Sequence, residues 1–318
     1  MKIIRGICYA AVLSILLTAC DARSVNLSQS LSQSLLVVFA LLALLFIAMW
    51  AKRLRHMRKN GEAWNWPKPV EIAIGAITDF FDTLGIGSFA PSTALFRIFK
   101  LVPDELIPGT LNVGHTLGTM TQALIFIQIV QVAPDTLLPM ILAAGVGAVI
   151  GTKMVGRLPR FQIRIGMGLA LLIAATIMFL SMQGVLPAGL DALSLSGWKW
   201  WVGVIGNLLL GVLMPLGIGL YAPCMILVSL LGMSPLAAFP IMMGSCAFLM
   251  PISSMGFFRN GKYLPSAALG IAIGGVPAVL LAAYVVKSLP LEFVRWIVLA
   301  VVLIVAMTLL RAAWSERQ

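Results

Sequence analysis

The sequence predicts an all-α polytopic membrane protein with two inverted repeats, and three observations carry this prediction. The chain is 60% hydrophobic and only 10% charged, with a mean hydropathy of +1.02, whereas soluble domains carry about 25% charged residues. Apolar runs of about 20 residues, long enough to cross a bilayer as helices, recur along the chain. A segment containing glycine and proline occurs twice. A soluble domain is therefore excluded, and the +11 net charge indicates membrane topology rather than nucleic-acid binding.

Residues 1–20 have the pattern of a secretory signal: a basic start at Met1–Arg5, an apolar run, and the lipobox-like Leu17-Thr18-Ala19-Cys20. Two interpretations stay open. The segment is either a signal peptide cleaved before a lipidated Cys20 or an uncleaved signal anchor. In both cases residues 1–20 lie outside the core of the fold.

Residues 21–69 are expected to hold one extra transmembrane helix, at 33–50, followed by a basic linker that runs to Lys68. Clustered Lys and Arg residues stay on the cytoplasmic side, so this helix runs from outside to inside. The cluster consists of Lys52, Arg53, Arg55, Arg58 and Lys59.

The duplicated segment is Leu-Gly-Ile-Gly-x-x-Ala-Pro, at 84–91 and again at 216–223, 132 residues later. Pro103 and Pro235 keep the same separation, as do Phe126 and Phe258. The predicted organisation is therefore repeat 1 at 70–183, an external linker at 184–200, repeat 2 at 201–311 and a cytoplasmic tail at 312–318.

Each glycine-rich segment could belong to a kinked span or to a re-entrant pair of half-helices. The re-entrant alternative puts nearly all Lys and Arg residues between the spans on the cytoplasmic side, so the positive-inside rule favours it. Each repeat then has one re-entrant pair and three spans. Because three is odd, the second repeat enters from the opposite face. The spans are expected at 106–129, 137–156 and 165–183, and at 236–257, 263–285 and 292–311.

The chemistry of the duplicated segment follows from its glycines and proline. Glycine lets the backbone leave helical geometry, and proline suits the first turn of a new helix. A helix N-terminus exposes free N–H groups that attract an anion. Two breaks that meet near mid-membrane would thus form an anion site. The alternative is that these glycines only allow tight helix packing.

Candidate site residues lie in or near the two breaks and on the helices that follow them. Asp82 and His115 are candidates for proton coupling, because an intramembrane carboxylate and an imidazole can carry protons; for each, a purely structural hydrogen bond is an equal alternative. The candidates for substrate binding are Gly85, Ile86, Gly87, Ser88, Ser92, Asn112, Thr116, Gly217, Ile218, Gly219, Tyr221, Cys224 and Ser245.

Other functions have little support in the sequence. The four cysteines lack the spacing of a metal site, and no nucleotide-binding Gly-x-x-x-x-Gly-Lys-Ser/Thr loop occurs. We therefore expect no enzyme activity, no metal, no cofactor and no nucleic-acid partner. The expected partners are a small anion and the lipid bilayer, and a homodimer is left open.

The duplicated segments, with the Leu-Pro pairs at 158–159 and 289–290, make the chain resemble the sulfite exporter TauE/SafE family over residues 70–311. The family's glycine run is longer; Ser88 and Leu220 stand where a further glycine is common. The resemblance implies an inner-membrane permease for sulfite, a sulfonate or a related organosulfur or carboxylate anion, working by alternating access. A non-transporting membrane sensor or assembly protein is the alternative.

Overall fold

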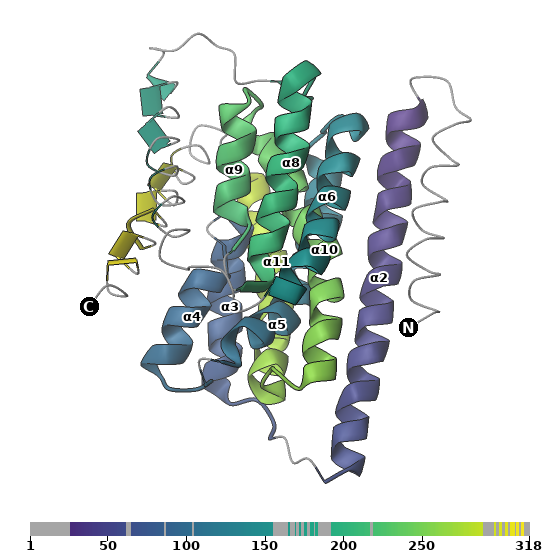
Figure 1. Cartoon of the computed structure of the whole chain (residues 1–318), viewed down its shortest axis with the longest axis vertical. Coiled ribbons are helices and arrows are strands. Elements are labelled where there is room, and N and C mark those ends of the chain that lie inside the picture. The colour runs from purple at the N-terminus through teal and green to yellow at the C-terminus, as the bar shows by residue number, and fades with distance from the viewer. Residues whose placement is uncertain are drawn as a thin grey trace.

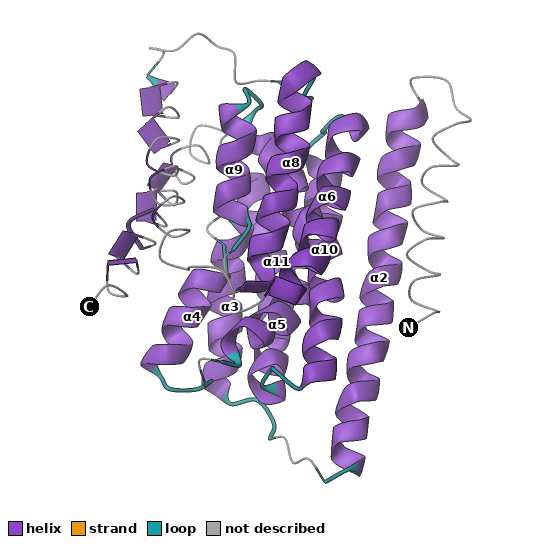
Figure 2. Ribbon diagram, viewed as in Figure 1, coloured by secondary structure: helices purple, strands orange, loops and turns teal. Residues whose placement is uncertain are grey.

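The computed structural model describes residues 26–61, 65–85, 87–103, 105–154, 192–216 and 219–288, with scattered positions at 165–183 and 296–314. This part of the chain is helical and contains no strand (Figures 1 and 2). Its helices are α2 (Asn26–Lys59), α3 (Pro69–Thr83), α4 (Phe89–Ile98), α5 (Ile107–Ile129), α6 (Pro134–Met154), α8 (Gly197–Leu213), η1 (Met214–Leu216), α9 (Tyr221–Leu230), η2 (Pro235–Ala237), α10 (Ala238–Asn260) and α11 (Pro265–Ser288).

Both duplicated segments form the predicted helix–break–helix. In the first, α3 ends at Thr83 and α4 begins at Phe89. Gly85 and Gly87 lie in the break with φ of +95° and +84°, values at which a side chain is strained, so glycine is needed there. In the second, η1 ends at Leu216 and α9 begins at Tyr221. Each short helix has ten residues and carries its proline in the first turn.

The two halves pack on each other reciprocally. Helix α3 of the first half lies along α11 of the second, and α8 of the second lies along α6 of the first, while α5 and α10 pack together. Glycines make these crossings close. A Cβ on Gly274 would lie 2.0 Å from the Ile72 carbonyl oxygen, and a Cβ on Gly211 would lie 2.2 Å from the Ala144 carbonyl oxygen. Small residues of this kind let membrane helices approach closely.

Four described helical segments are long and apolar enough to cross a membrane: Gln33–Lys59, Pro134–Thr152, Ala238–Asn260 and Pro265–Val285. They correspond to four of the predicted spans. The predicted span at 106–129 is also one helix, α5, which is not among these four segments; a line of polar residues follows its buried face. The predictions for 1–20, for most of 165–183 and 292–311, and for the tail at 312–318 lie outside the described residues.

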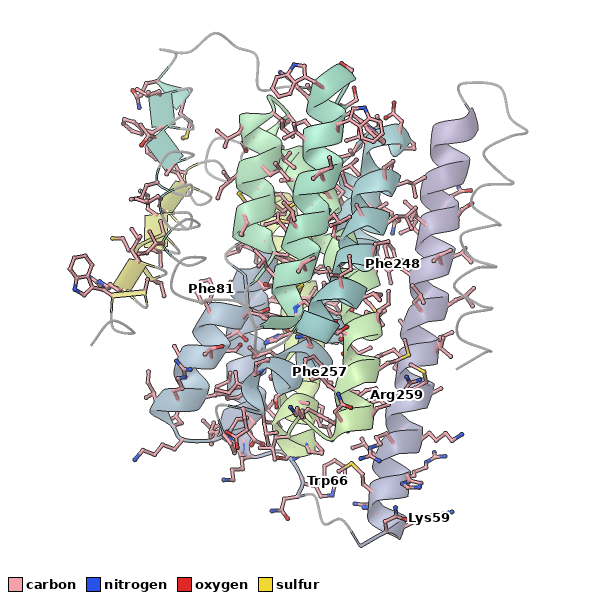
Figure 3. All side chains as sticks on the ribbon, viewed as in Figure 1. Lys59, Trp66, Phe81, Phe248, Phe257 and Arg259 are labelled. Atoms are coloured by element: carbon pink, nitrogen blue, oxygen red, sulfur yellow. The ribbon has the colours of Figure 1, made fainter. Side chains whose placement is uncertain are left out.

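Helix α2 differs from the expected short span with a basic linker. It has 34 residues, or about 50 Å at 1.5 Å per residue, which exceeds the hydrocarbon thickness of about 30 Å. The whole basic cluster is therefore part of the helix. Lys59 lies at the same end of the molecule as Arg259, at the end of α10 (Figure 3).

Candidate functional site

The two breaks meet at one small cavity. Its volume is about 10 Å³, close to the minimum that holds one water molecule. Four pairs of lining residues are related by the 132-residue separation of the repeats, and Thr119 and Met250 complete the wall. The pairs are Asp82 and Met214, Gly87 and Gly219, Ser88 and Leu220, and Phe89 and Tyr221.

The breaks also contact each other reciprocally. A Cβ on Gly87 would lie 3.8 Å from the Cβ of Tyr221, and a Cβ on Gly219 would lie 3.6 Å from the Cβ of Phe89. Each glycine thus faces the first residue of the other repeat's short helix. The N-termini of α4 and α9, which carry free N–H groups, therefore border the same cavity.

The cavity is polar on one side and apolar on the other. Repeat 1 contributes the carboxylate of Asp82 and the hydroxyl of Ser88, where repeat 2 has Met214 and Leu220. In the remaining pair the polarity is reversed, since repeat 2 contributes the hydroxyl of Tyr221 and repeat 1 has Phe89. The two repeats thus place equivalent backbone positions around the cavity, but the side chains at these positions differ in polarity.

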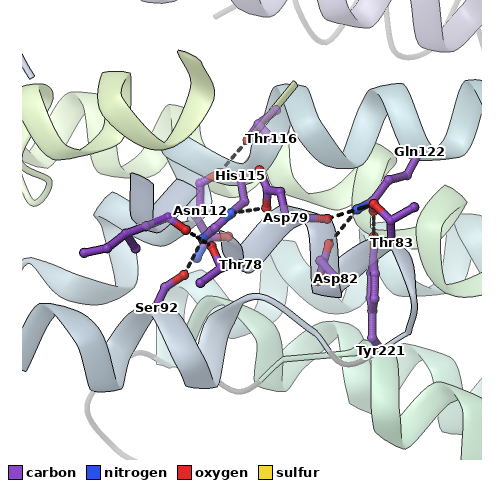
Figure 4. Close-up of polar contacts among 11 residues, drawn as sticks. Thr78, Asp79, Asp82, Thr83, Ser92, Asn112, His115, Thr116, Gln122 and Tyr221 are labelled. Carbon is purple, nitrogen blue, oxygen red and sulfur yellow. Dashed lines mark hydrogen bonds and ion pairs between the residues drawn. The ribbon is translucent and has the colours of Figure 1, made fainter. Parts of the chain in front are cut away.

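Gln122 of α5 organises the polar side (Figure 4). Its amide nitrogen donates to Asp82 Oδ2 at 2.9 Å and to Thr83 Oγ1 at 3.0 Å. Its side-chain oxygen accepts a hydrogen bond from the Tyr221 hydroxyl. All four side chains are buried. One amide therefore joins the end of α3 to the start of α9, across the boundary between the repeats.

A second buried chain of polar groups lies on α3, α5 and α4 (Figure 4). His115 Nδ1 is 2.5 Å from Asp79 Oδ1, and His115 Nε2 is 3.0 Å from Ser92 Oγ. The exposed fraction is 0% for His115 and Ser92 and 1% for Asp79. His115 therefore bridges the two half-helices of the first hairpin.

Other candidates from the sequence lie away from the cavity. Asn112 accepts a hydrogen bond from Ser253 at 3.1 Å, and Thr116 lies 3.4 Å from Ser254. These contacts join α5 to α10. Thr116 also donates to the Asn112 carbonyl oxygen at 2.5 Å. The geometry of both residues is that of a helix–helix contact.

The candidates of repeat 2 divide in the same way. Gly219 and Tyr221 line the cavity, whereas Ser245 accepts a hydrogen bond from Asn207 at 2.8 Å. Cys224 and Cys246 are buried free thiols, and Cys246 contacts the Met214 sulfur at 3.4 Å. Ile86, Gly217 and Ile218 lie outside the described residues.

Sequence reasoning overlooked two buried residues, Asp79 and Asn207. Asp79 lies one helical turn before Asp82, so a second carboxylate on one face of an apolar helix was the available signal. Asn207 had no such signal, because its partners, the Met140 carbonyl and Ser245, lie 67 and 38 residues away. Among the described residues, no group of three His, Cys, Asp or Glu side chains could hold a metal ion.

The comparisons with known proteins identify the family. The family model described as Sulfite exporter TauE/SafE matches residues 1–178 and, in a second overlapping match, residues 83–310. No match was found among curated proteins or among solved structures. The two matches together span nearly the whole chain, including both glycine breaks. This apolar helical chain thus belongs to the Sulfite exporter TauE/SafE family of membrane transporters.

Proposed function

We propose that this protein is a secondary transporter that moves sulfite, a sulfonate or a related small organosulfur or carboxylate anion across the inner membrane. The observation that carries the proposal is the cavity between the two breaks, where equivalent residues of both repeats meet. In transporters built from inverted repeats, substrates bind near mid-membrane between broken helices.

The cavity has the chemistry of an anion site. The N-termini of α4 and α9 border it, and a helix N-terminus offers free N–H donors and a positive dipole end to a negative ligand. Ser88, Thr119 and Tyr221 add hydroxyl groups, which can donate to the oxygens of a sulfite or carboxylate.

The cavity is too small for such an anion in this conformation, since its volume suits one water molecule. Binding requires the two hairpins to separate, and we propose that they part alternately towards the two sides of the membrane. The glycine-lined crossings of α3 with α11 and of α6 with α8 each join the two repeats. These closely packed helices would support the two hairpins as they move.

We propose that the repeats have inverted topology. The reciprocal packing of α3 on α11 and α8 on α6 supports this assignment, because it is the pattern expected from a two-fold axis. The position of Lys59 and Arg259 at one end of the molecule also supports it (Figure 3). Both would then be cytoplasmic, in agreement with the positive-inside rule.

Transport is proposed to be coupled to protons. Asp82 lines the cavity, so an ionised Asp82 and a bound anion would repel each other at close range. Binding of the anion is therefore favoured when Asp82 is protonated. His115 is a further buried proton acceptor close to the same hairpin.

The test is a flux assay with purified protein in proteoliposomes, using labelled sulfite, sulfonates and small carboxylates. We expect saturable exchange of at least one anion and faster net flux under an imposed pH gradient. Conversion of Ser88 to Ala should weaken binding of that anion, whereas Ser229→Ala, on α9 of the second hairpin and outside the cavity, should not. Absence of flux for every anion would favour a non-transporting sensor or assembly protein.

A further inference from the structure

We propose that Asp79 and His115 form the transporter's proton-binding site and that the coupled cation is a proton rather than sodium. This inference rests on the proposed function and extends it to Asp79, which does not line the cavity. It starts from the 2.5 Å contact between Asp79 Oδ1 and His115 Nδ1 in a place where neither side chain meets solvent.

The second oxygen of Asp79 is unusual. Asp79 Oδ2 is buried and has no hydrogen-bond partner. It lies against the backbone of two glycines on different helices: a Cβ on Gly275 of α11 would be 1.8 Å away, and a Cβ on Gly118 of α5 would be 2.6 Å away. The carboxylate therefore occupies a space between α5 and α11 that exists only because both neighbouring residues are glycine.

The packing around Asp79 determines which cation can bind there. A metal cation needs several oxygen ligands around it, as Ca²⁺ and Mg²⁺ do, and the glycine backbones occupy the space around Oδ2. The closest side-chain partner on the other oxygen is an imidazole nitrogen, which suits a proton and not sodium. Only a proton fits between these groups.

The net charge of the Asp79–His115 pair depends on whether the proton is bound, and the buried conformation favours a pair without net charge. With the coupled proton on the Asp79 carboxyl group and a neutral imidazole on His115, the pair carries no net charge. Loss of that proton would leave a buried carboxylate whose Oδ2 has no donor, which is strongly unfavourable. The described conformation is therefore the proton-loaded one. Release requires water to reach Asp79, which needs α3, α5 and α11 to move apart.

The Asp79–His115 pair is also hydrogen-bonded to the second half-helix of the first hairpin. A neutral His115 that donates from Nδ1 to Asp79 accepts at Nε2 from the Ser92 hydroxyl of α4. Helix α4 carries one of the N-termini at the cavity. The proton site is thus joined by a direct hydrogen bond to the helix that binds the anion.

The described residues around the pair include few other titratable groups. Helix α11 faces Asp79 with Gly275, and Val279 lies beside Gly118, while α4 faces His115 with Ser92 and Phe89. Among the described residues, the titratable neighbours of the pair are Asp82 of α3 and Tyr221 of α9, while Cys246 of α10 interacts with Asp82 and not with the pair. Of these, Asp82 is the only carboxylate, and the experiment must separate it from Asp79.

The first measurement needs no substrate. Infrared difference spectra of the purified protein in lipid, recorded as the pH is changed, report protonation of buried carboxyl groups. We expect a band that disappears in Asp79→Asn, changes frequency in His115→Gln and persists in Asp82→Asn. A spectrum unchanged by Asp79→Asn would overturn the proposal.

The second measurement is transport of radiolabelled sulfite in proteoliposomes. In Asp79→Asn and His115→Gln, exchange at equal pH should continue, whereas accumulation driven by a pH gradient should fall at least tenfold. Gly118→Ala, whose new methyl group would displace Asp79 Oδ2, should also reduce the accumulation driven by the pH gradient. Gly256→Ala is the control, because its Cβ would meet nothing within 4 Å.

Each remaining outcome decides the question. Three results would overturn the proton site. The first is accumulation driven by the pH gradient that survives Asp79→Asn. The others are a variant that loses exchange as well as gradient-driven accumulation, and accumulation driven by a sodium gradient. If the wild-type protein exchanges no sulfite while the infrared band behaves as expected, sulfite transport fails and the proton site stands.

Discussion

Tyr221 donates a hydrogen bond to the side-chain oxygen of Gln122, 99 residues away. It joins the first residue of α9 to α5, and through Gln122 it reaches Asp82. Both partners are buried, so the bond fixes how the second break meets the polar side of the first.

Tyr221→Phe tests this bond. It leaves the Gln122 oxygen without its donor, which costs about 1–3 kcal/mol for a buried acceptor. We expect lower thermal stability and weaker anion binding, measured by thermal unfolding and by the concentration dependence of flux. Tyr284→Phe is the matched control, because Tyr284 is 75% exposed. Equal effects of the two variants would contradict the structural role of the bond.

Asp82→Asn should remove the pH dependence of anion affinity. In the wild-type protein, raising the pH ionises Asp82 and places a negative charge in the cavity, so affinity should fall as pH rises. Asparagine stays neutral and keeps an oxygen for Gln122. The Michaelis constant of exchange, measured between pH 5 and pH 8, should rise in the wild type and stay constant in the variant. A parallel rise in both would remove Asp82 from the anion site.

Gly87→Ala should reduce flux more than its cost in stability explains. Its φ of +84° is strained for any other residue by about 1–2 kcal/mol, and Gly87 lies in the cavity wall. Gly61→Ala is a close control: its φ is +74° and nothing lies within 4 Å of its Cβ, but it follows α2, away from the cavity. We expect similar losses of melting temperature and a loss of flux only at Gly87.

Gly211→Ala tests the crossing of α6 and α8. The new methyl group would lie 2.2 Å from the Ala144 carbonyl oxygen, and because that atom is backbone, the helices must separate. Overpacking of this kind costs about 1–3 kcal/mol. Thermal unfolding should show a clear destabilisation. Gly256→Ala, with open space around its Cβ, should unfold like the wild type; a similar loss there would deny that the crossing is special.

Cysteine labelling tests the inverted topology. Lys100, Lys199 and Lys262 are exposed, so a cysteine at each position should react. A membrane-impermeant reagent added outside should label Lys199→Cys only, and the other two should need access from the cytoplasm. External labelling of Lys100→Cys would show that the first hairpin crosses the membrane, against the re-entrant arrangement.

The sequence alone was sufficient for much of the architecture. Hydropathy located α2, α6, α10 and α11, because a bilayer demands long apolar helices wherever they occur. The duplicated glycines and prolines located both breaks, because backbone preferences are local and act within a few residues.

Only the tertiary structure decided which polar groups meet. The sequence indicated Asp82 and His115 as two candidates for proton coupling without giving their partners; in the structure Asp82 bonds Gln122 and His115 bonds Asp79. Asp79 escaped notice because its significance depends on Gly118 and Gly275, which lie 39 and 196 residues further along the chain. Periodicity along one helix indicates a face but not its partner. The partner is set by how α3, α5 and α11 pack, and that packing depends on the chain as a whole.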